Sequence, residues 1–189
     1  MLILTLPGSR KSEVTRLAPV IGATLERIKA IYPGARVALP TVPNVAQLVA
    51  DLTRDWPITP QIIEHPALKR AAFAAADVAI AASGTVSLEL AANHCPMVVA
   101  YKMHPVSFWL MQRAALIDTV TLVNLVSETR VVPEFLGPKC QPDLIAEAVL
   151  TLLQDRRAQD QAMDLTMQRL GQGGEPPGLR AARSVLSRL

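Results

Sequence analysis

Short apolar runs alternate with longer segments of helical periodicity along almost the whole chain. The runs have the length of buried strands, and the segments between them are long enough to form helices. Strands are predicted at 2–6, 36–39, 61–63, 78–82, 96–100 and 121–123, and helices at 12–31, 44–52, 66–75, 84–92, 106–117 and beyond 142. Successive strand–helix–strand units of this kind predict an α/β fold, in which a doubly wound parallel sheet is covered by helices on both faces.

Length and composition restrict the class of protein further. A chain of 189 residues fits one domain, and with 50% hydrophobic but only 4% aromatic residues its core must be built from Ala, Val, Leu and Ile. The formal net charge is +3 and there is no block of Lys and Arg, so we expect no nucleic-acid partner. The two cysteines, Cys95 and Cys140, lack the spacing of a zinc site and are expected to be reduced thiols of a cytoplasmic protein.

The sequence predicts no membrane span. Its most apolar stretch, residues 71–101, is interrupted by Asp77, Glu89 and His94, whereas a span needs about 20 nearly uncharged residues. The first residues have no basic segment and too short an apolar run for a signal peptide. The cluster Phe108–Met111 is expected to pack in the core, with contact to a lipid surface as the alternative.

In doubly wound sheets ligands bind beyond the carboxyl ends of the strands. Ser83, Gly84 and Thr85 follow the predicted strand 78–82 and open a helix, where free N–H groups form a potential anion site. The alternative is that Ser83 and Thr85 only cap the helix. Glu89 follows one turn later, either as an acceptor for ribose hydroxyls or as part of the outer surface of the helix.

The segment Pro7–Arg10 follows the first predicted strand in the same way. A glycine permits a tight turn and Arg10 carries a planar guanidinium suited to phosphate, although this signal is weak by itself. No Walker A motif, GxGxxG, HExxH or DxD occurs, so we predict neither a metal nor another cofactor. The histidines are expected to be structural, and only His104 follows a predicted strand closely enough to reach such a site.

Several of these segments together resemble one enzyme family. They are Leu6–Arg10 with Glu13, Ala82–Thr85 with Leu88 and Glu89, Pro96–Val99 with Tyr101–Met103, Leu122–Leu125, and Val132–Glu134. In this order and at similar spacing they resemble the C-terminal half of lipid-A-disaccharide synthase. The resemblance covers nearly the whole chain. One departure is Val123, which stands where the family has proline.

The resemblance implies the donor-binding half of a two-domain GT-B glycosyltransferase with Rossmann-like halves. The family is a cytoplasmic, Gram-negative one that works at the inner-membrane surface. It transfers a sugar with inversion from UDP-2,3-diacylglucosamine to 2,3-diacylglucosamine 1-phosphate and uses no metal. The residues implied in nucleotide binding are Gly8, Ser9, Arg10, Ser83, Gly84, Thr85, Glu89, Tyr101, Lys102, Met103 and Asn124, with Arg10 also aiding catalysis electrostatically.

The resemblance also implies that an N-terminal half carrying the acceptor site and the general base is a partner of this chain. Residues 1–170 would form the donor domain, and 171–189 a linker and a C-terminal helix with an apolar stripe that could join two copies. Whether the chain is an excised domain or a short homologue is left open. We expect nucleotide binding with little turnover. The alternatives are a UDP-sugar 2-epimerase-like domain and a non-catalytic nucleotide-binding or assembly module.

Overall fold

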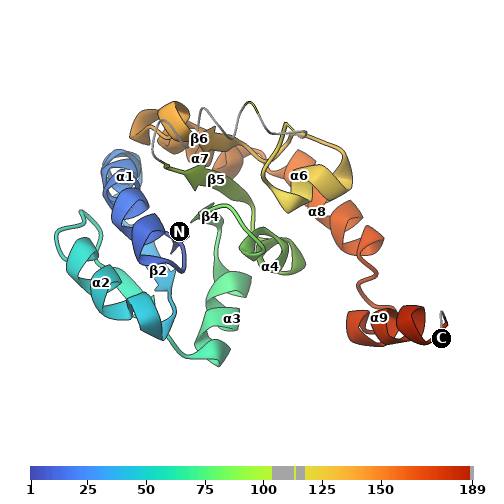
Figure 1. Ribbon diagram of the computed structural model, residues 1–189. Coiled ribbons are helices and arrows are strands. Elements are labelled where there is room, and N and C mark those ends of the chain that lie inside the picture. Colours follow the sequence, from blue (N-terminus) through green and yellow to red (C-terminus); the bar gives the residue numbers. More distant parts are fainter. Residues whose placement is uncertain (104–112, 114–117, 188–189) are drawn as a thin grey trace.

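The computed structural model describes residues 1–103, 113 and 118–187, and Figure 1 shows a sheet surrounded by helices. All described strand pairs are parallel, and the six-stranded sheet has the order β3-β2-β1-β4-β5-β6. The strands are β1 (Leu2–Leu6), β2 (Arg36–Pro40), β3 (Pro60–Ile63), β4 (Val78–Ala81), β5 (Met97–Tyr101) and β6 (Glu134–Leu136). This order confirms the predicted doubly wound α/β fold, in which the winding reverses between β1 and β4.

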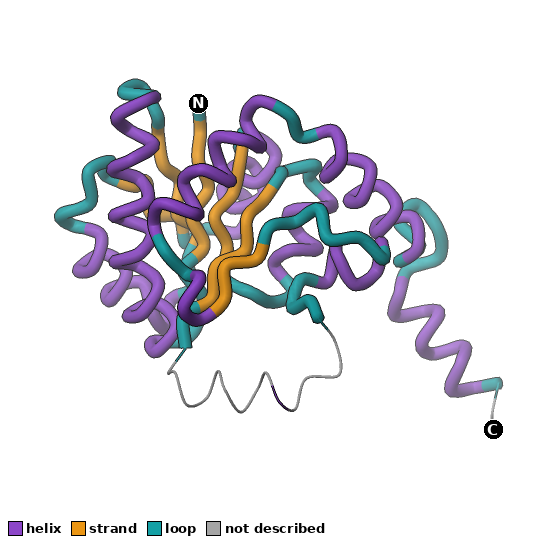
Figure 2. Tube along the Cα trace, turned by 90° about the horizontal axis from the view of Figure 1, so that it is seen from above, coloured by secondary structure: helices purple, strands orange, loops and turns teal. Residues whose placement is uncertain are grey.

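Helices cover both faces of this sheet, as Figure 2 shows. The helices are α1 (Lys11–Ile31), α2 (Pro43–Thr53), α3 (Pro66–Ala75), α4 (Val86–Ala92), α6 (Leu122–Ser127), α7 (Pro142–Gln154), α8 (Arg157–Arg169) and α9 (Pro177–Leu186), with a 3-10 turn at Gly137–Lys139. Helices α1, α2 and α7 pack on one face, and α3, α4, α6 and α8 pack on the other. The alternation of buried side chains along each strand creates these two core layers.

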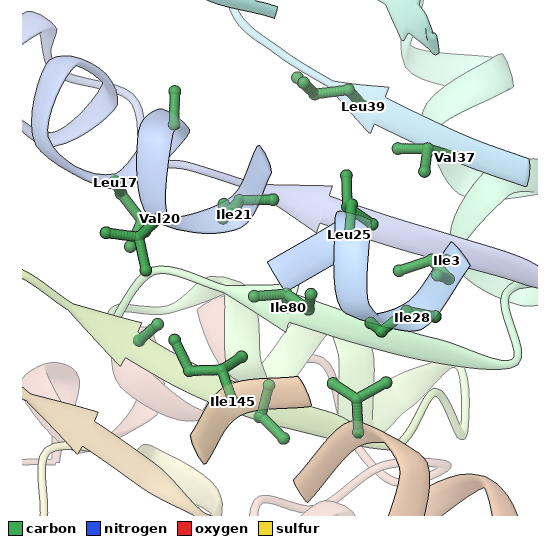
Figure 3. Packing of buried hydrophobic residues seen from close by; sticks show 14 of the residues in the cluster. Ile3, Leu17, Val20, Ile21, Leu25, Ile28, Val37, Leu39, Ile80 and Ile145 are labelled. Atoms are coloured by element: carbon green, nitrogen blue, oxygen red, sulfur yellow. The ribbon is translucent and has the colours of Figure 1, made fainter. Parts of the chain in front are cut away.

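The core layer between α1 and the sheet explains why the spacing of apolar residues predicted these elements. Leu25 and Ile28 of α1 lie on its inner face at helical spacing and meet Ile3 of β1, Val37 of β2 and Ile80 of β4 (Figure 3). Four of these five side chains are fully buried, and Val37 is 3% exposed. Shortening such a side chain leaves a cavity and lowers the free energy of unfolding by about 2–5 kcal/mol. The packing of this layer therefore stabilises both the register of the strands and the position of α1 on the sheet.

The predicted strand 121–123 was wrong, and a strand was missed. Residues 122–127 form α6, and the sixth strand, β6, follows at Glu134–Leu136. The β-branched residues Thr121 and Val123 favour a strand, but the Glu134 carboxylate accepts hydrogen bonds from the Val120 and Thr121 N–H groups (3.1 and 2.8 Å) and so fixes the turn that leads into α6. The other predicted strands agree within two residues, and the predicted helix 106–117 lies outside the described residues.

The C-terminal region extends from this sandwich. After α8 the chain turns at Gly171 and Gly173, both with positive φ, and α9 then points away from the sheet (Figures 1 and 2). The predicted helix break is present, although α9 begins at Pro177 and therefore includes Gly178. Among the described helices, none is long and apolar enough to cross a membrane.

Candidate functional site

A pocket of about 480 Å³ lies at the carboxyl ends of β1, β2 and β4, next to the point where the winding reverses. Two predicted segments, Gly8–Arg10 and Ser83–Thr85, and the predicted Glu89 all line it. The remaining lining residues are Leu6, Glu13, Pro40, Thr41, Val42, Lys69, Ala82 and Val86. The fold thus brings together the turns after β1 and β4, which are about 75 residues apart in sequence, as expected for a ligand site in a doubly wound sheet.

The turn after β1 depends on Gly8 and Glu13. Gly8 has φ +113°, and a Cβ there would lie 2.6 Å from Glu13 Oε2, so only glycine fits without a shift. Glu13 Oε2 accepts hydrogen bonds from the Ser9 and Arg10 N–H groups (3.1 and 3.3 Å). Its other oxygen, Oε1, accepts one from Arg10 Nη1 at 2.9 Å. Glu13 therefore holds the turn closed and keeps the exposed guanidinium of Arg10 at the pocket.

The turn after β4 presents its backbone to open space. Gly84 has φ +146°, and a Cβ built on it would meet no atom within 4 Å. The Ser83 hydroxyl donates to the Val120 carbonyl oxygen at 3.2 Å rather than serving as a helix cap. Thr85, the N-cap residue of α4, makes no side-chain capping hydrogen bond. The alternative that both hydroxyls merely cap α4 is therefore wrong, and the exposed Thr85 lies in the lining of the pocket.

Glu89 forms an ion pair that sequence reasoning missed. Lys69 Nζ on α3 lies 2.7 Å from Glu89 Oε2 on α4, and the same ammonium lies 5.3 Å from the centre of the Phe73 ring. The sequence analysis did not single out Lys69, because nothing local indicated that α3 would lie beside α4. The pocket therefore has two ion pairs in its lining, Arg10 with Glu13 and Lys69 with Glu89.

Four of the predicted nucleotide-binding residues are not among the lining of this pocket. Tyr101 is the last residue of the neighbouring strand, β5, and Lys102 and Met103 follow it. Asn124 is 1% exposed; its amide donates to the Val132 carbonyl oxygen and accepts from the Val132 N–H, each at 2.9 Å. With its side chain satisfied in this way, Asn124 joins α6 to the segment before β6, so the geometry favours a structural role for it.

The chemistry of the remaining groups agrees with a site that uses no thiol. Cys95 and Cys140 are free, as the sequence predicted, and both are buried. Burial raises the pKa of Cys95 to about 12 and also raises the pKa of Cys140, so both stay protonated at neutral pH. Among the described residues no group of His, Cys, Asp and Glu could hold a metal ion. His104 and Phe108–Met111 lie outside the described residues.

A second hollow, of about 420 Å³, lies between α3 and strands β2 and β3. Its lining is mostly apolar, with Leu68, Ala71 and Ala75 on the helix side, and it includes none of the residues in the turns after β1 and β4. Since it offers few groups that could orient a polar ligand, the pocket at the strand ends is the candidate site.

The strand order and the position of this pocket define a class: a Rossmann-like, doubly wound α/β domain with a pocket where the winding reverses. The chain superposes on a glycosyltransferase of kitacinnamycin with a TM-score of 0.60 at 20% identity, covering 100% of this chain and 43% of that one. A UDP-GlcNAc 2-epimerase from Neisseria meningitidis matches with a TM-score of 0.55 at 17% identity, covering 86% and 38%. At these identities the likeness concerns the fold alone.

The family follows from sequence. The model of the lipid-A-disaccharide synthetase family matches residues 1–182, and the chain belongs to that family. Lipid-A-disaccharide synthase from Ruegeria pomeroyi is 56% identical over 196 residues, covering 100% of this chain and 49% of the relative. The enzyme from Rhodospirillum centenum is 45% identical over 98% of this chain and 47% of its own length. The chain thus spans about half the length of the curated relatives it matches.

Proposed function

We propose that this chain binds the UDP part of a UDP-sugar in the pocket at the ends of β1 and β4. The donor would be UDP-2,3-diacylglucosamine, and the reaction of the full-length protein the formation of lipid A disaccharide. The observation that carries the proposal is the arrangement around Gly84. An open, glycine-containing turn at a helix start lies next to a carboxylate, Glu89, in one pocket of a chain that belongs to this family.

Each part of the pocket suits one part of UDP. The N–H groups of Gly84 and Thr85, together with the Thr85 hydroxyl, are suited to the diphosphate, since backbone N–H groups at a helix start favour anions. Glu89 is exposed enough to accept hydrogen bonds from ribose hydroxyls, with a side-chain accessibility of 51%. Arg10 at the opposite turn also lines the pocket, and its guanidinium is suited to the diphosphate.

The chemistry proposed for the full-length protein is an inverting transfer. A hydroxyl oxygen of the acceptor forms a bond to the anomeric carbon while the bond from that carbon to the UDP oxygen breaks. The hydroxyl proton goes to a general base in the other half, and UDP leaves with the bonding electrons. Groups of this chain would assist by stabilising the negative charge that grows on the diphosphate. Arg10 and the N–H groups of Gly84 and Thr85 are the groups that we expect to do this.

The cellular setting belongs to the same proposal. A diacylated donor and acceptor would place the full-length protein in the cytoplasm of a Gram-negative bacterium, in transient contact with the inner membrane. Residues 1–170 would act as the donor domain, and Tyr101–Met103 would approach the nucleotide from the end of β5. Titration of the chain with UDP tests the proposed binding directly. Turnover of UDP-2,3-diacylglucosamine by the full-length protein tests the proposed reaction.

A further inference from the structure

The ion pair between Lys69 and Glu89 joins two helices that belong to different crossovers. Helix α3 connects β3 to β4, and α4 connects β4 to β5, so residues 20 apart in sequence meet at the pocket. Lys69 Nζ lies 2.7 Å from Glu89 Oε2 and 5.3 Å from the Phe73 ring centre. Phe73, also on α3, is 1% exposed and packs in the core. Its contact with the Lys69 ammonium therefore restricts where that ammonium can lie.

We propose that Lys69 is a positioning residue for ribose recognition, which deepens the proposed function and rests on it. A carboxylate has two oxygens, each able to accept hydrogen bonds. Lys69 holds Oε2 of Glu89 and thereby sets the plane of the carboxylate and the direction of Oε1. The oxygen left free is then presented to the hydroxyls of a ribose bound in the pocket.

Stability alone gives little reason for this ion pair. The side chains of Lys69 and Glu89 are 37% and 51% exposed, and pairs this accessible to water contribute little to the stability of a fold. The pair orders two long side chains and gains little stability in return. A role of the fixed carboxylate in binding a ligand would explain why the pair is present. Replacing Lys69 should therefore leave the fold intact and alter the recognition of the ribose hydroxyls.

The test compares UDP with 2′,3′-dideoxy-UDP, which lacks the hydroxyls that Glu89 would bind. Calorimetric titration of the 189-residue chain should show the wild type preferring UDP by about tenfold or more, as expected when hydrogen bonds to a charged group are lost. Lys69→Met should reduce that preference to about threefold or less. The ratio of the two affinities does not change when a positive charge near the diphosphate is lost, because that loss weakens the binding of both nucleotides alike.

Three controls separate positioning from other effects. Lys69→Arg, which keeps the cation, should retain most of the preference for UDP. Arg70→Met removes a cation from the next position of the same helix, outside the lining of the pocket, and should change nothing. In a Glu89→Ala background, which should itself abolish the preference, Lys69→Met should reduce it no further.

The possible results are distinct. If Lys69→Met weakens both nucleotides by the same factor, or neither, the positioning role is wrong. If it lowers the melting temperature by many degrees, Lys69 is a structural residue and the proposal fails for that reason. If the wild-type chain does not bind UDP at all, the proposed function fails and this inference fails with it, before any variant is compared.

Discussion

Glu134 offers the most direct test of how the structure holds the turn after β4. Its carboxylate accepts hydrogen bonds from the N–H groups of Val120 and Thr121 and from the Thr119 hydroxyl. Thr119 and Thr121 are each 2% exposed, so water cannot easily replace the acceptor. The Val120 carbonyl oxygen in turn accepts the hydrogen bond from Ser83. Glu134 therefore orders a loop that contacts the proposed UDP site.

The Glu134→Ala substitution takes the acceptor from the buried Thr119 hydroxyl and leaves the Thr121 N–H only its 3.3 Å hydrogen bond to Thr119 Oγ1. An unsatisfied buried donor costs about 1–3 kcal/mol and the weakened one adds about 1 kcal/mol, so we expect a loss of about 2–4 kcal/mol in the free energy of unfolding. For a domain of this size, that corresponds to a fall of roughly 5–15 °C in the melting temperature. Glu134→Gln keeps an acceptor oxygen and should lose only about 1 kcal/mol.

Urea denaturation followed by circular dichroism measures these losses. Glu147→Ala is the matched control, since Glu147 is exposed on α7 and its removal should change the stability by less than about 0.5 kcal/mol. A Glu134→Ala loss as small as that of the control would refute the reasoning that this carboxylate holds the loop before α6.

Three further predictions concern other parts of the molecule. In a full-length chain of the family, Arg10→Ala should lower the rate by a large factor with almost no change in melting temperature, because the Arg10 side chain is 78% exposed; a large melting loss with normal activity would make it structural. Folding raises the pKa of Cys95 from 9.0 to about 12, so the unfolded chain binds fewer protons than the folded chain between these pH values. The free energy of unfolding should therefore fall by up to about 1 kcal/mol per pH unit as the pH rises from 9 towards 12. Cys95→Ser should flatten this decline, and an unchanged slope would contradict the assignment. Leu179, Val185 and Leu186 of α9 are 57–69% exposed, so light scattering should detect self-association of the full chain and not of a chain ending at Leu170; two monomers of equal stability would contradict it.

The sequence predicted the elements whose periodicity reflects burial on the sheet. Strands such as β1 and β4 are almost entirely buried, and α1 repeats its apolar residues at helical spacing, so local pattern and tertiary environment agree. The prediction failed at residues 121–136, where no such agreement exists. There β6 is a three-residue, half-buried edge strand, and the turn before α6 is held by a carboxylate 13 residues later in the sequence.

The site was predictable where it follows strand ends and not where it depends on neighbouring helices. Gly8–Arg10 and Ser83–Thr85 follow β1 and β4, and strand order brings them together. Lys69 became visible only once α3 was placed beside α4. Asn124 was singled out by the family resemblance, yet its hydrogen bonds with Val132 depend on a strand that the pattern did not reveal.

Calorimetric titration of UDP into the 189-residue chain tests the central claim most directly. We expect one binding event, weakened by about tenfold or more in Thr85→Ala and in Glu89→Ala, since each variant removes a hydrogen bond in which one partner is charged. Thr151→Ala, far from the pocket on α7, provides the matched control and should bind UDP as the wild type does. Equal affinity of the wild type, Thr85→Ala and Glu89→Ala for UDP, or no binding by any of them, would contradict the assignment of this pocket.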